Sequence, residues 1–317
     1  MTRPEPFEVI VVGAGPAGLA AALYLARFRR SVLVVHDGQS RALRIPKTYN
    51  VPGYPEGIAG VELVQRLTDH AVEFGAVIVE AQIRSAQRSG KGFMLTSADG
   101  RRWGSRALIL ATGIRLNQVD LPHAEHEAAI RADILRYCPV CDGYEHIDSK
   151  IGVIGCDSNG AAEALFLRQY SRDITLMPHS HSELSREQIT ELDEAGIAVV
   201  QGALRSLSPQ GDRVDVVLDG HDRPLSFDVL YPALGTRPRS ELAAGLGVVV
   251  ADDGCVDAGA VRQTSVPGLF AAGDVVEGLD QISVAIGHGA LAATSAHNWL
   301  RECDRHTLQA AGRKKPS

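Results

Sequence analysis

Two cysteines separated by two residues carry the clearest chemical signal in this chain. Cys138 and Cys141 stand in the run Cys-Pro-Val-Cys-Asp-Gly, a spacing that suits a redox-active disulfide or half of a zinc site. Zinc would need two further ligands, and the nearest, His146 and Cys156, do not form a second pair at the usual spacing. Pro139 fixes φ inside the motif, and the start of a helical turn lowers the pKa of a thiol. We therefore predict a redox dithiol, with zinc and a pair of buried structural thiols as the alternatives.

A glycine-rich turn near the start of the chain predicts a dinucleotide site. The turn Gly-Ala-Gly-Pro-Ala-Gly follows an apolar run at residues 7–12 and precedes helical spacing over residues 16–28. Glycines allow close approach of the backbone, and the N–H groups at a helix N-terminus face the negative charge of a pyrophosphate. An acid about 20 residues further on can accept from ribose hydroxyls. The alternative is a tight turn that binds nothing. The residues predicted to contact the dinucleotide are Gly13, Gly15, Pro16, Ala17, Gly18 and Asp37.

The pattern of strand, glycine turn, helix and strand occurs twice. It runs over residues 7–35 and begins again over residues 150–177, and a helix predicted over residues 283–300 is expected to return to the first domain. The predicted fold class is therefore α/β, with two Rossmann-like, three-layer domains, the second inserted into the first. The predicted segments are 1–117 and 241–317 for the first domain and 118–240 for the inserted domain.

Composition narrows the classes of function and the compartment. The 317 residues are 45% hydrophobic, and the formal net charge is −6, so the chain offers no global positive field for nucleic acid or for an anionic membrane. An uncharged run at residues 9–26 is interrupted by glycines and a proline, which favours strand, turn and helix over a membrane span. The five cysteines are too sparse and irregular for a secreted disulfide framework, so we expect a cytoplasmic protein.

Taken together, these motifs resemble the low-molecular-weight thioredoxin reductases among the FAD-dependent disulfide oxidoreductases. The resemblance extends over nearly all of residues 7–301. It is carried by Gly13 to Gly18, Asn50 in Asn-Val-Pro-Gly, Ala111-Thr112-Gly113, Cys138 to Gly143, and the run from Thr264 to Asp274.

The resemblance implies FAD in the first domain. In that family the aspartate of the Gly-Asp pair bonds the ribityl chain, and a following glutamine reaches the flavin. A helix that begins near Ile282 would also aim its positive end at the flavin and favour the reduced form. His288, within that helix, matches no functional residue of the family, and we expect it to be a packed or exposed histidine. The further FAD contacts that the resemblance implies are Asn50, Ala111, Thr112, Gly113, Gly273, Asp274, Gln281 and Ile282.

The resemblance also implies a role for each group of the dithiol motif. Cys141 would exchange electrons with FAD, Cys138 would attack the partner, and Asp142 would be the general acid or base. Members of the family more often read Cys-Ala-Thr-Cys, so Pro139 and Val140 leave the redox potential and the identity of the partner open.

The second glycine loop departs from the family pattern for NADPH. It reads Gly-Cys-Asp-Ser-Asn-Gly, with Asp157 where a second glycine is expected. That carboxylate adds a negative charge where a pyrophosphate would approach. The expected run of arginines is replaced by Met-Pro-His-Ser-His-Ser at residues 177–182, which offers little fixed positive charge for a 2′-phosphate. Arg186 could replace the missing arginines as a partner of the 2′-phosphate. We predict that NADPH is not an efficient electron donor.

Three functions remain open at this point. The leading hypothesis is a homodimeric FAD-dependent disulfide oxidoreductase whose Cys138–Cys141 pair serves a thioredoxin-like protein or a small-molecule dithiol or disulfide. Its donor would be other than NADPH, with a ferredoxin-type protein or a second flavin as possibilities, and the direction of electron flow is open. The alternatives are an NADPH-dependent thioredoxin reductase with a divergent loop and a flavin-binding redox sensor without turnover. Replacing Cys138 with serine without loss of electron transfer would favour the sensor.

Overall fold

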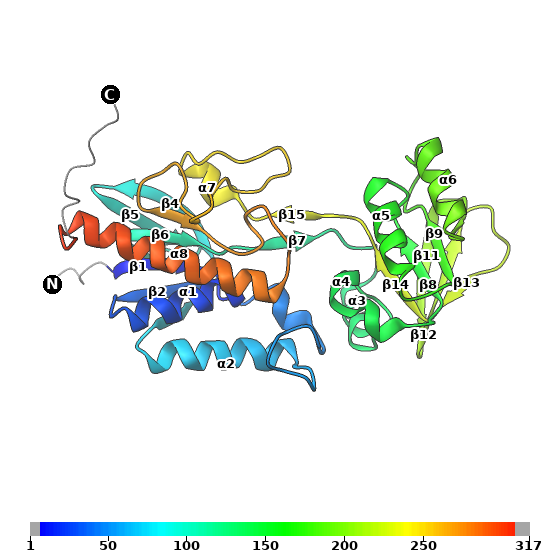
Figure 1. Cartoon of the computed structure of the whole chain (residues 1–317), viewed down its shortest axis with the longest axis horizontal. Helices are drawn as coiled ribbons and strands as arrows, with labels where there is room; N and C mark the ends of the chain where they lie inside the picture. Colours follow the sequence, from blue (N-terminus) through cyan, green and yellow to red (C-terminus); the bar gives the residue numbers. More distant parts are fainter. Residues whose placement is uncertain (1–6, 308–317) are drawn as a thin grey trace, which may run out of the picture. The chain divides into compact units, whose positions relative to one another are not determined.

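The computed structural model describes residues 7–307, and Figure 1 shows the order of their elements. Residues 1–6 and 308–317, the outer ends of the predicted first domain, lie outside the described residues. By its internal contacts the chain divides into two compact units. The first contains residues 7–43, 62–114 and 238–307, and the second contains residues 44–61 and 115–237. The second unit is therefore built mainly from a segment that lies within the first unit in chain order.

A seven-stranded sheet forms the centre of the first unit. Its strand order is β3-β2-β1-β6-β5-β4, and β16 pairs with β6. Strands β3, β2, β1, β6 and β16 are parallel, whereas β5 and β4 add an antiparallel extension. The elements are β1 (Phe7–Val12), α1 (Pro16–Arg27), β2 (Val32–His36), η1 (Arg41–Arg44), α2 (Gly60–Glu73), β3 (Val77–Glu80), β4 (Ile83–Ser89), β5 (Gly92–Ser97), β6 (Arg102–Leu110), α7 (Glu241–Gly245), β16 (Leu269–Ala271) and α8 (Ile282–Cys303).

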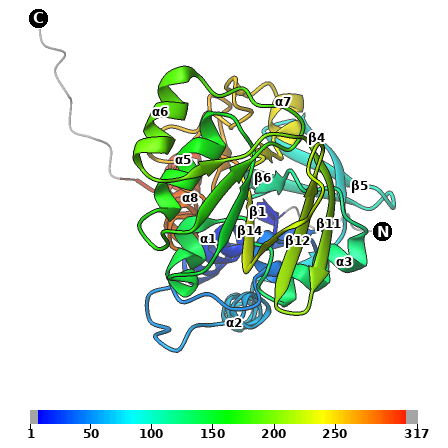
Figure 2. The same ribbon diagram turned by 90° about the vertical axis from the view of Figure 1, so that its right-hand side faces the viewer.

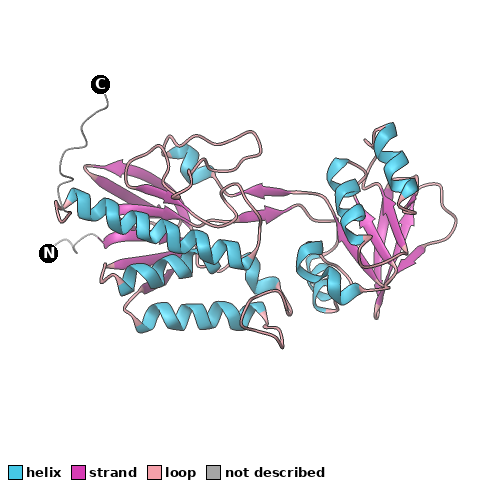
Figure 3. Cartoon of the chain, viewed as in Figure 1, coloured by secondary structure: helices cyan, strands magenta, loops and turns pink. Residues whose placement is uncertain are grey.

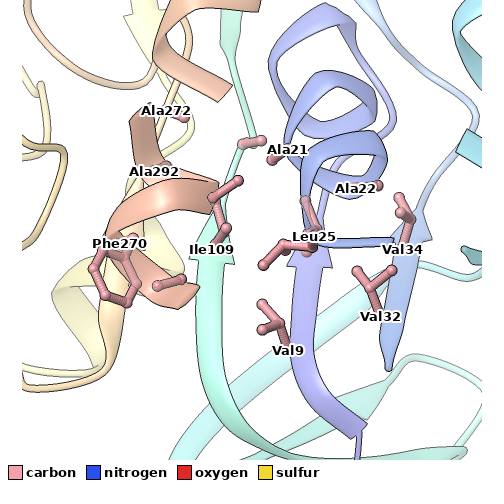
Figure 4. Close-up of a cluster of buried hydrophobic side chains, with 14 of the residues drawn as sticks. Val9, Ala21, Ala22, Leu25, Val32, Val34, Ile109, Phe270, Ala272 and Ala292 are labelled. Carbon is pink, nitrogen blue, oxygen red and sulfur yellow. The ribbon is translucent and has the colours of Figure 1, made fainter. Parts of the chain in front are cut away.

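Both faces of this sheet are buried. Val9 and Val11 of β1 contact the cluster that α1 and α8 cover, and Ile10 and Val12 face the opposite cluster, which includes residues of β5 and α7. Figure 3 shows the helices of this unit running along the sheet, and Figure 4 shows side chains of α1 and α8 above the parallel strands. Small side chains let α1 and α8 approach closely, because a Cβ on Gly289 would lie 2.2 Å from the carbonyl oxygen of Ala17. Strands buried on both faces explain the continuous apolar runs in the sequence.

The second unit repeats the same plan on a smaller scale. A parallel sheet has the order β10-β9-β8-β14, and a separate antiparallel sheet has the order β11-β12-β13. One face of the parallel sheet packs on α5 and α6, and the other packs on the antiparallel sheet, as Figure 2 shows for α5, α6, β14 and β12. The elements are α3 (His123–Arg131), α4 (Pro139–Asp142), η2 (Gly143–His146), β8 (Ile151–Ile154), α5 (Ser158–Leu167), β9 (Ile174–Met177), α6 (Arg186–Glu194), β10 (Ala198–Val199), β11 (Leu204–Gln210), β12 (Arg213–Leu218), β13 (Leu225–Phe227) and β14 (Val229–Pro232).

The predicted α/β fold with two Rossmann-like domains is confirmed. The chain passes between the units through β7 (Ile114–Leu116) and β15 (Thr236–Pro238), which form a two-stranded sheet. The predicted domain limits at 117/118 and 240/241 fall close to these strands and remain predictions of where the domains begin and end. Within residues 7–307, no helix is long and apolar enough to cross a membrane.

Candidate functional site

The first glycine turn leaves no room for a side chain at Gly13 or Gly18. Gly13 has φ of +112°, and a Cβ there would lie 2.2 Å from the carbonyl oxygen of Ala111. A Cβ on Gly18 would lie 1.9 Å from the carbonyl oxygen of Gly13. Gly15 is the N-cap of α1 with extended backbone, and among the described residues no side chain caps this end of the helix. Pro16 occupies the first turn. The turn therefore presents backbone N–H groups, the arrangement that a pyrophosphate requires.

The other predicted dinucleotide residues follow the carboxyl ends of parallel strands. Asp37 comes directly after β2, and residues 111–113 come directly after β6. The Asp37 carboxylate pairs with the Arg239 guanidinium at 3.2 Å, and the Thr112 hydroxyl donates to the Arg239 carbonyl at 2.7 Å. The carboxyl ends of the strands form the edge at which α/β sheets bind nucleotides. The glycine turn, Asp37 and residues 111–113 thus lie at one edge.

An acidic cluster follows β16 at the same edge. The Asp274 carboxylate pairs with the Arg41 guanidinium at 3.2 Å, and Asp280 lies 3.8 Å from the same group. Burial raises the pKa of Asp274, and burial together with the Asp274 charge raises the pKa of Asp280 to about 6. A Cβ on Gly273, which has φ of +78°, would lie 2.7 Å from the Ala17 Cβ. Sequence reasoning did not single out Arg41.

The remaining candidate residues of the first unit lie in and before α8. Gln281 is the N-cap of α8 and Ile282 is its first residue, as the sequence predicted for a helix beginning there. His288 is partly buried beside Gly278 and has no assigned role. Burial and the charge of Arg262 lower its pKa. The cramped glycine turn with its uncapped helix end and the carboxylates Asp37 and Asp274 fit the pyrophosphate, ribose and ribityl groups of FAD.

Cys138 and Cys141 form a disulfide in the second unit, with their Cα atoms 5.3 Å apart. Cys138 is the N-cap of α4, Pro139 occupies the first turn, and the Cys141 N–H donates to the Cys138 carbonyl at 2.9 Å. The described residues contain no group of three or more His, Cys, Asp or Glu that could hold a metal ion. The sulfurs are bonded to each other, so this arrangement favours the redox interpretation over the zinc alternative.

Asn50, predicted to contact FAD, lies beside the dithiol motif within the second unit. Its side-chain amide donates to the Val140 carbonyl at 3.3 Å, and its oxygen accepts from the Thr48 hydroxyl at 2.9 Å. This segment belongs to the second unit by its contacts. The bond links Asn50 to the loop between the two cysteines.

The Asp142 carboxyl is held in a buried cluster. The Tyr231 hydroxyl donates to Oδ1 at 2.8 Å, and the Arg136 Nε lies 3.4 Å from Oδ2. Burial raises the pKa of Asp142 to about 6. The His146 ring lies edge-on to the Tyr231 ring, with centroids 6.1 Å apart, and burial lowers the pKa of His146 to about 4. The carboxyl next to the dithiol is therefore poised to exchange a proton near neutral pH.

Sequence reasoning did not assign Tyr231 or Arg136, and it considered His146 only as a zinc ligand. Two features of the sequence could have drawn attention to these residues. Tyr231 lies near the carboxyl end of β14, a parallel strand in a nucleotide-type fold. Arg136 stands two residues before the first cysteine. Neither signal identifies the Asp142 side chain as the partner.

The second glycine turn carries an internal negative charge. The Asp157 side chain caps α5 and accepts from the Gly160 N–H at 2.8 Å. Burial and the Asp157 charge raise the pKa of Glu163 to about 7. After β9, the exposed His181 pairs with Glu183 at 2.8 Å. The helix end that would face a pyrophosphate is thus occupied by a carboxylate.

The fold and these sites define an oxidoreductase that joins a dinucleotide domain to a disulfide-bearing domain. Residues 7–289 match the model of the pyridine nucleotide-disulphide oxidoreductase family, and the chain belongs to this family. It is 31% identical over 318 residues to a thioredoxin reductase of Mycolicibacterium smegmatis, covering 96% of this chain and 99% of the relative. It is 28% identical over 314 residues to the thioredoxin reductase of Bacillus subtilis, covering 95% and 97% respectively.

Solved structures agree with this assignment. The crystal structure of HlmI superposes with a TM-score of 0.88 at 29% identity, covering 96% of each chain. The atypical thioredoxin reductase TRi from Desulfovibrio vulgaris Hildenborough gives 0.53 at 32% identity, covering 95% of this chain and 99% of that one. The predicted family is confirmed: the chain is a thioredoxin reductase-like, FAD-dependent oxidoreductase that acts on a sulfur group.

Proposed function

We propose that this enzyme exchanges electrons between FAD and a substrate disulfide or dithiol through the Cys138–Cys141 pair, without NADPH as its natural donor. The observation that carries the proposal is the disulfide between these cysteines, followed directly by a partly buried carboxyl that accepts from the Tyr231 hydroxyl, in a chain that also carries a dinucleotide turn. The thioredoxin reductases among its relatives support a thioredoxin-like partner, and a small-molecule dithiol or disulfide is the other candidate.

In the oxidised state, the proposed reaction consumes a substrate dithiol. One substrate thiolate attacks the Cys138 sulfur, a mixed disulfide forms, and Cys141 leaves as a thiolate. The second substrate thiol, after giving up its proton, attacks the substrate sulfur in that mixed disulfide, so the substrate leaves as a disulfide and Cys138 as a thiolate. Asp142 accepts or returns the protons. The reverse sequence reduces a substrate disulfide, and Cys138 is then the attacking thiolate.

FAD, when bound, would supply the two-electron partner that oxidises the Cys138–Cys141 dithiol or reduces the disulfide. We assign Cys141 to the exchange with the flavin, on the resemblance to the family. The residues proposed to hold FAD are Gly13, Gly15, Pro16, Ala17, Gly18, Asp37, Asn50, Ala111, Thr112, Gly113, Gly273, Asp274, Gln281 and Ile282.

NADPH is expected to reduce the bound flavin poorly. The Asp157 carboxylate occupies the Gly160 N–H, and the positions after β9 offer histidines rather than arginines. Each lost charge-assisted hydrogen bond is worth about 1.5 to 3 kcal/mol, so losing two weakens binding about a hundredfold or more. Anaerobic titration of the holoenzyme should bleach the flavin with dithiothreitol, whereas equimolar NADPH should leave it oxidised.

Rapid bleaching by low NADPH would overturn donor independence and establish the second candidate, an NADPH-dependent thioredoxin reductase. The name of its relatives favours that candidate. A coupled assay with thioredoxin then measures NADPH consumption directly. If NADPH fails, reduced ferredoxin and the number of flavins per chain are tested next, because a ferredoxin-type donor or a second flavin would replace it.

Replacing Asp142 with asparagine is expected to remove a pH dependence. With the pKa of Asp142 near 6, wild-type dithiol oxidation should fall as pH drops below about 6, because the protonated carboxyl cannot accept a proton. Asp142→Asn should be slower at neutral pH and show no such fall. The measurement is the rate of flavin bleaching by dithiothreitol from acidic to alkaline pH, divided at each pH by the concentration of dithiothreitol thiolate, because loss of thiolate alone slows every variant as pH falls; an unchanged profile would contradict the acid–base role.

The cellular setting is also proposed. We infer a cytoplasmic enzyme that works as a homodimer, with an FAD domain of residues 1–117 and 241–317 and an inserted domain of residues 118–240. Size-exclusion chromatography with light scattering measures the mass of the holoenzyme, and a monomer would contradict the dimer.

A further inference from the structure

We propose that Tyr231 is a positioning residue for the disulfide chemistry: its buried hydroxyl fixes the Asp142 carboxyl and favours its ionised, proton-accepting state. This inference rests on the proposed role of Asp142. Tyr231 lies 89 positions after Asp142 in the sequence and belongs to no sequence motif.

The tyrosine is a rigid donor. Tyr231 is fully buried, and β14 is fixed by its parallel pairing with β8, in which Tyr231 stands opposite Val153. Its ring packs in the apolar cluster between the sheet and α5. Its hydroxyl donates to Asp142 Oδ1 at 2.8 Å. A hydroxyl held in this way fixes one carboxyl oxygen.

Both oxygens of the Asp142 carboxyl have defined neighbours. Tyr231 holds Oδ1, and the Arg136 Nε faces Oδ2 at 3.4 Å. Arg136 also pairs with Asp133, so its charge is shared. The charge of Glu145, in η2, also acts on the carboxyl and opposes its ionisation. Tyr231 therefore gives this carboxylate a neutral hydrogen-bond donor at 2.8 Å.

The tyrosine itself stays protonated. Burial, and then the charge of Asp142, raise the pKa of Tyr231 far above neutrality, so its oxygen donates to the carboxylate and does not compete for the proton. His146, beside the ring, faces Arg136 and Asp228, and its pKa is lowered to about 4 by burial. The imidazole is neutral in the range where Asp142 titrates, which leaves Tyr231 and Arg136 to oppose the effect of burial.

Removing the hydroxyl should make Asp142 harder to ionise. A hydrogen bond to a charged group stabilises it enough to move a titration by about one to two pH units. In Tyr231→Phe, the acidic limb of the pH–rate profile should move upward by about one pH unit. The rate above that limb should fall less than it does in Asp142→Asn, since the dithiol and the carboxyl are both still present.

The test compares four FAD-loaded proteins: wild type, Tyr231→Phe, Tyr170→Phe and Asp142→Asn. Tyr170 is the matched control, because its ring packs against Gly143, next to Asp142, where a Cβ on Gly143 would lie 2.7 Å from it. Flavin bleaching by dithiothreitol is followed across pH, and each rate is divided by the concentration of dithiothreitol thiolate at that pH. We expect an upward shift in Tyr231→Phe, a wild-type limb in Tyr170→Phe and no limb in Asp142→Asn.

Two failures are distinguishable. If the wild-type flavin is not bleached by dithiothreitol, the proposed function fails. If wild type and Asp142→Asn behave as expected but the limb of Tyr231→Phe coincides with wild type, only the role of Tyr231 is contradicted. Should Tyr231→Phe not fold, uniform labelling with ring-fluorinated tyrosine keeps the ring and strengthens the donor, and the limb should then move to lower pH. An unmoved limb contradicts the inference.

Discussion

Cys138→Ser and Cys141→Ser should each lower the rate of dithiothreitol oxidation by on the order of a thousandfold or more, because each removes one sulfur of a pair that can act only together. The flavin content of both variants should match wild type, since none of the residues proposed to hold FAD is changed. Steady-state oxidation of dithiothreitol under air, normalised to bound flavin, measures the effect.

Cys303→Ser is the matched control. Cys303 is an exposed free thiol at the end of α8, so the same chemical change there should leave the rate within about twofold of wild type. Equal activity of wild type and Cys138→Ser toward every disulfide and dithiol would contradict the proposed redox pair. That outcome would favour the redox sensor.

Gly13→Ala should abolish stable FAD binding. The new Cβ would lie 2.2 Å from a backbone oxygen, at a φ of +112° that alanine rarely adopts. Strain of this kind costs about 1 to 3 kcal/mol and overpacking about as much again, so FAD should bind at least about thirtyfold more weakly. Absorption of the purified protein, set against its concentration, gives the flavin bound per chain.

Gly245→Ala is the matched control: it shows whether loss of FAD follows from the change at Gly13 or from any glycine-to-alanine change in the first unit. Gly245 lies in α7, and a Cβ there would meet nothing within 4 Å. Alanine should be tolerated there, because it meets no neighbouring atom and Gly245 is the last residue of the helix. Full flavin content in Gly13→Ala would show that the turn does not approach the dinucleotide.

The parts of the fold that the sequence predicted are those set by local chemistry. The second strand, turn, helix and strand pattern, predicted over residues 150–177, contains β8, α5 and β9, and α8 was predicted within three residues of its ends. Buried parallel strands read as continuous apolar runs, and glycines mark the turns that follow them. The antiparallel sheet of β11 to β13 was not predicted, because its strands are partly exposed and its pairing depends on the parallel sheet beneath it.

The candidate site was predictable only where residues are close in sequence. The Cys-x-x-Cys motif and Asp142 lie in one run, and the disulfide forms within it. The contacts that determine how Asp142 titrates come from Tyr231 and Arg136, and those that surround Asp274 come from Arg41, which lies 233 positions away. No motif links such pairs, because their proximity arises only when the sheet assembles.

The central claim is that the dithiol and the flavin share electrons, and a stoichiometric reductive titration tests it most directly. Under anaerobic conditions, wild-type holoenzyme should take up one equivalent of dithionite for its flavin and a second for its disulfide. The Cys138→Ser/Cys141→Ser double variant should take up only the flavin equivalent. An identical uptake by wild type and the double variant would contradict the account.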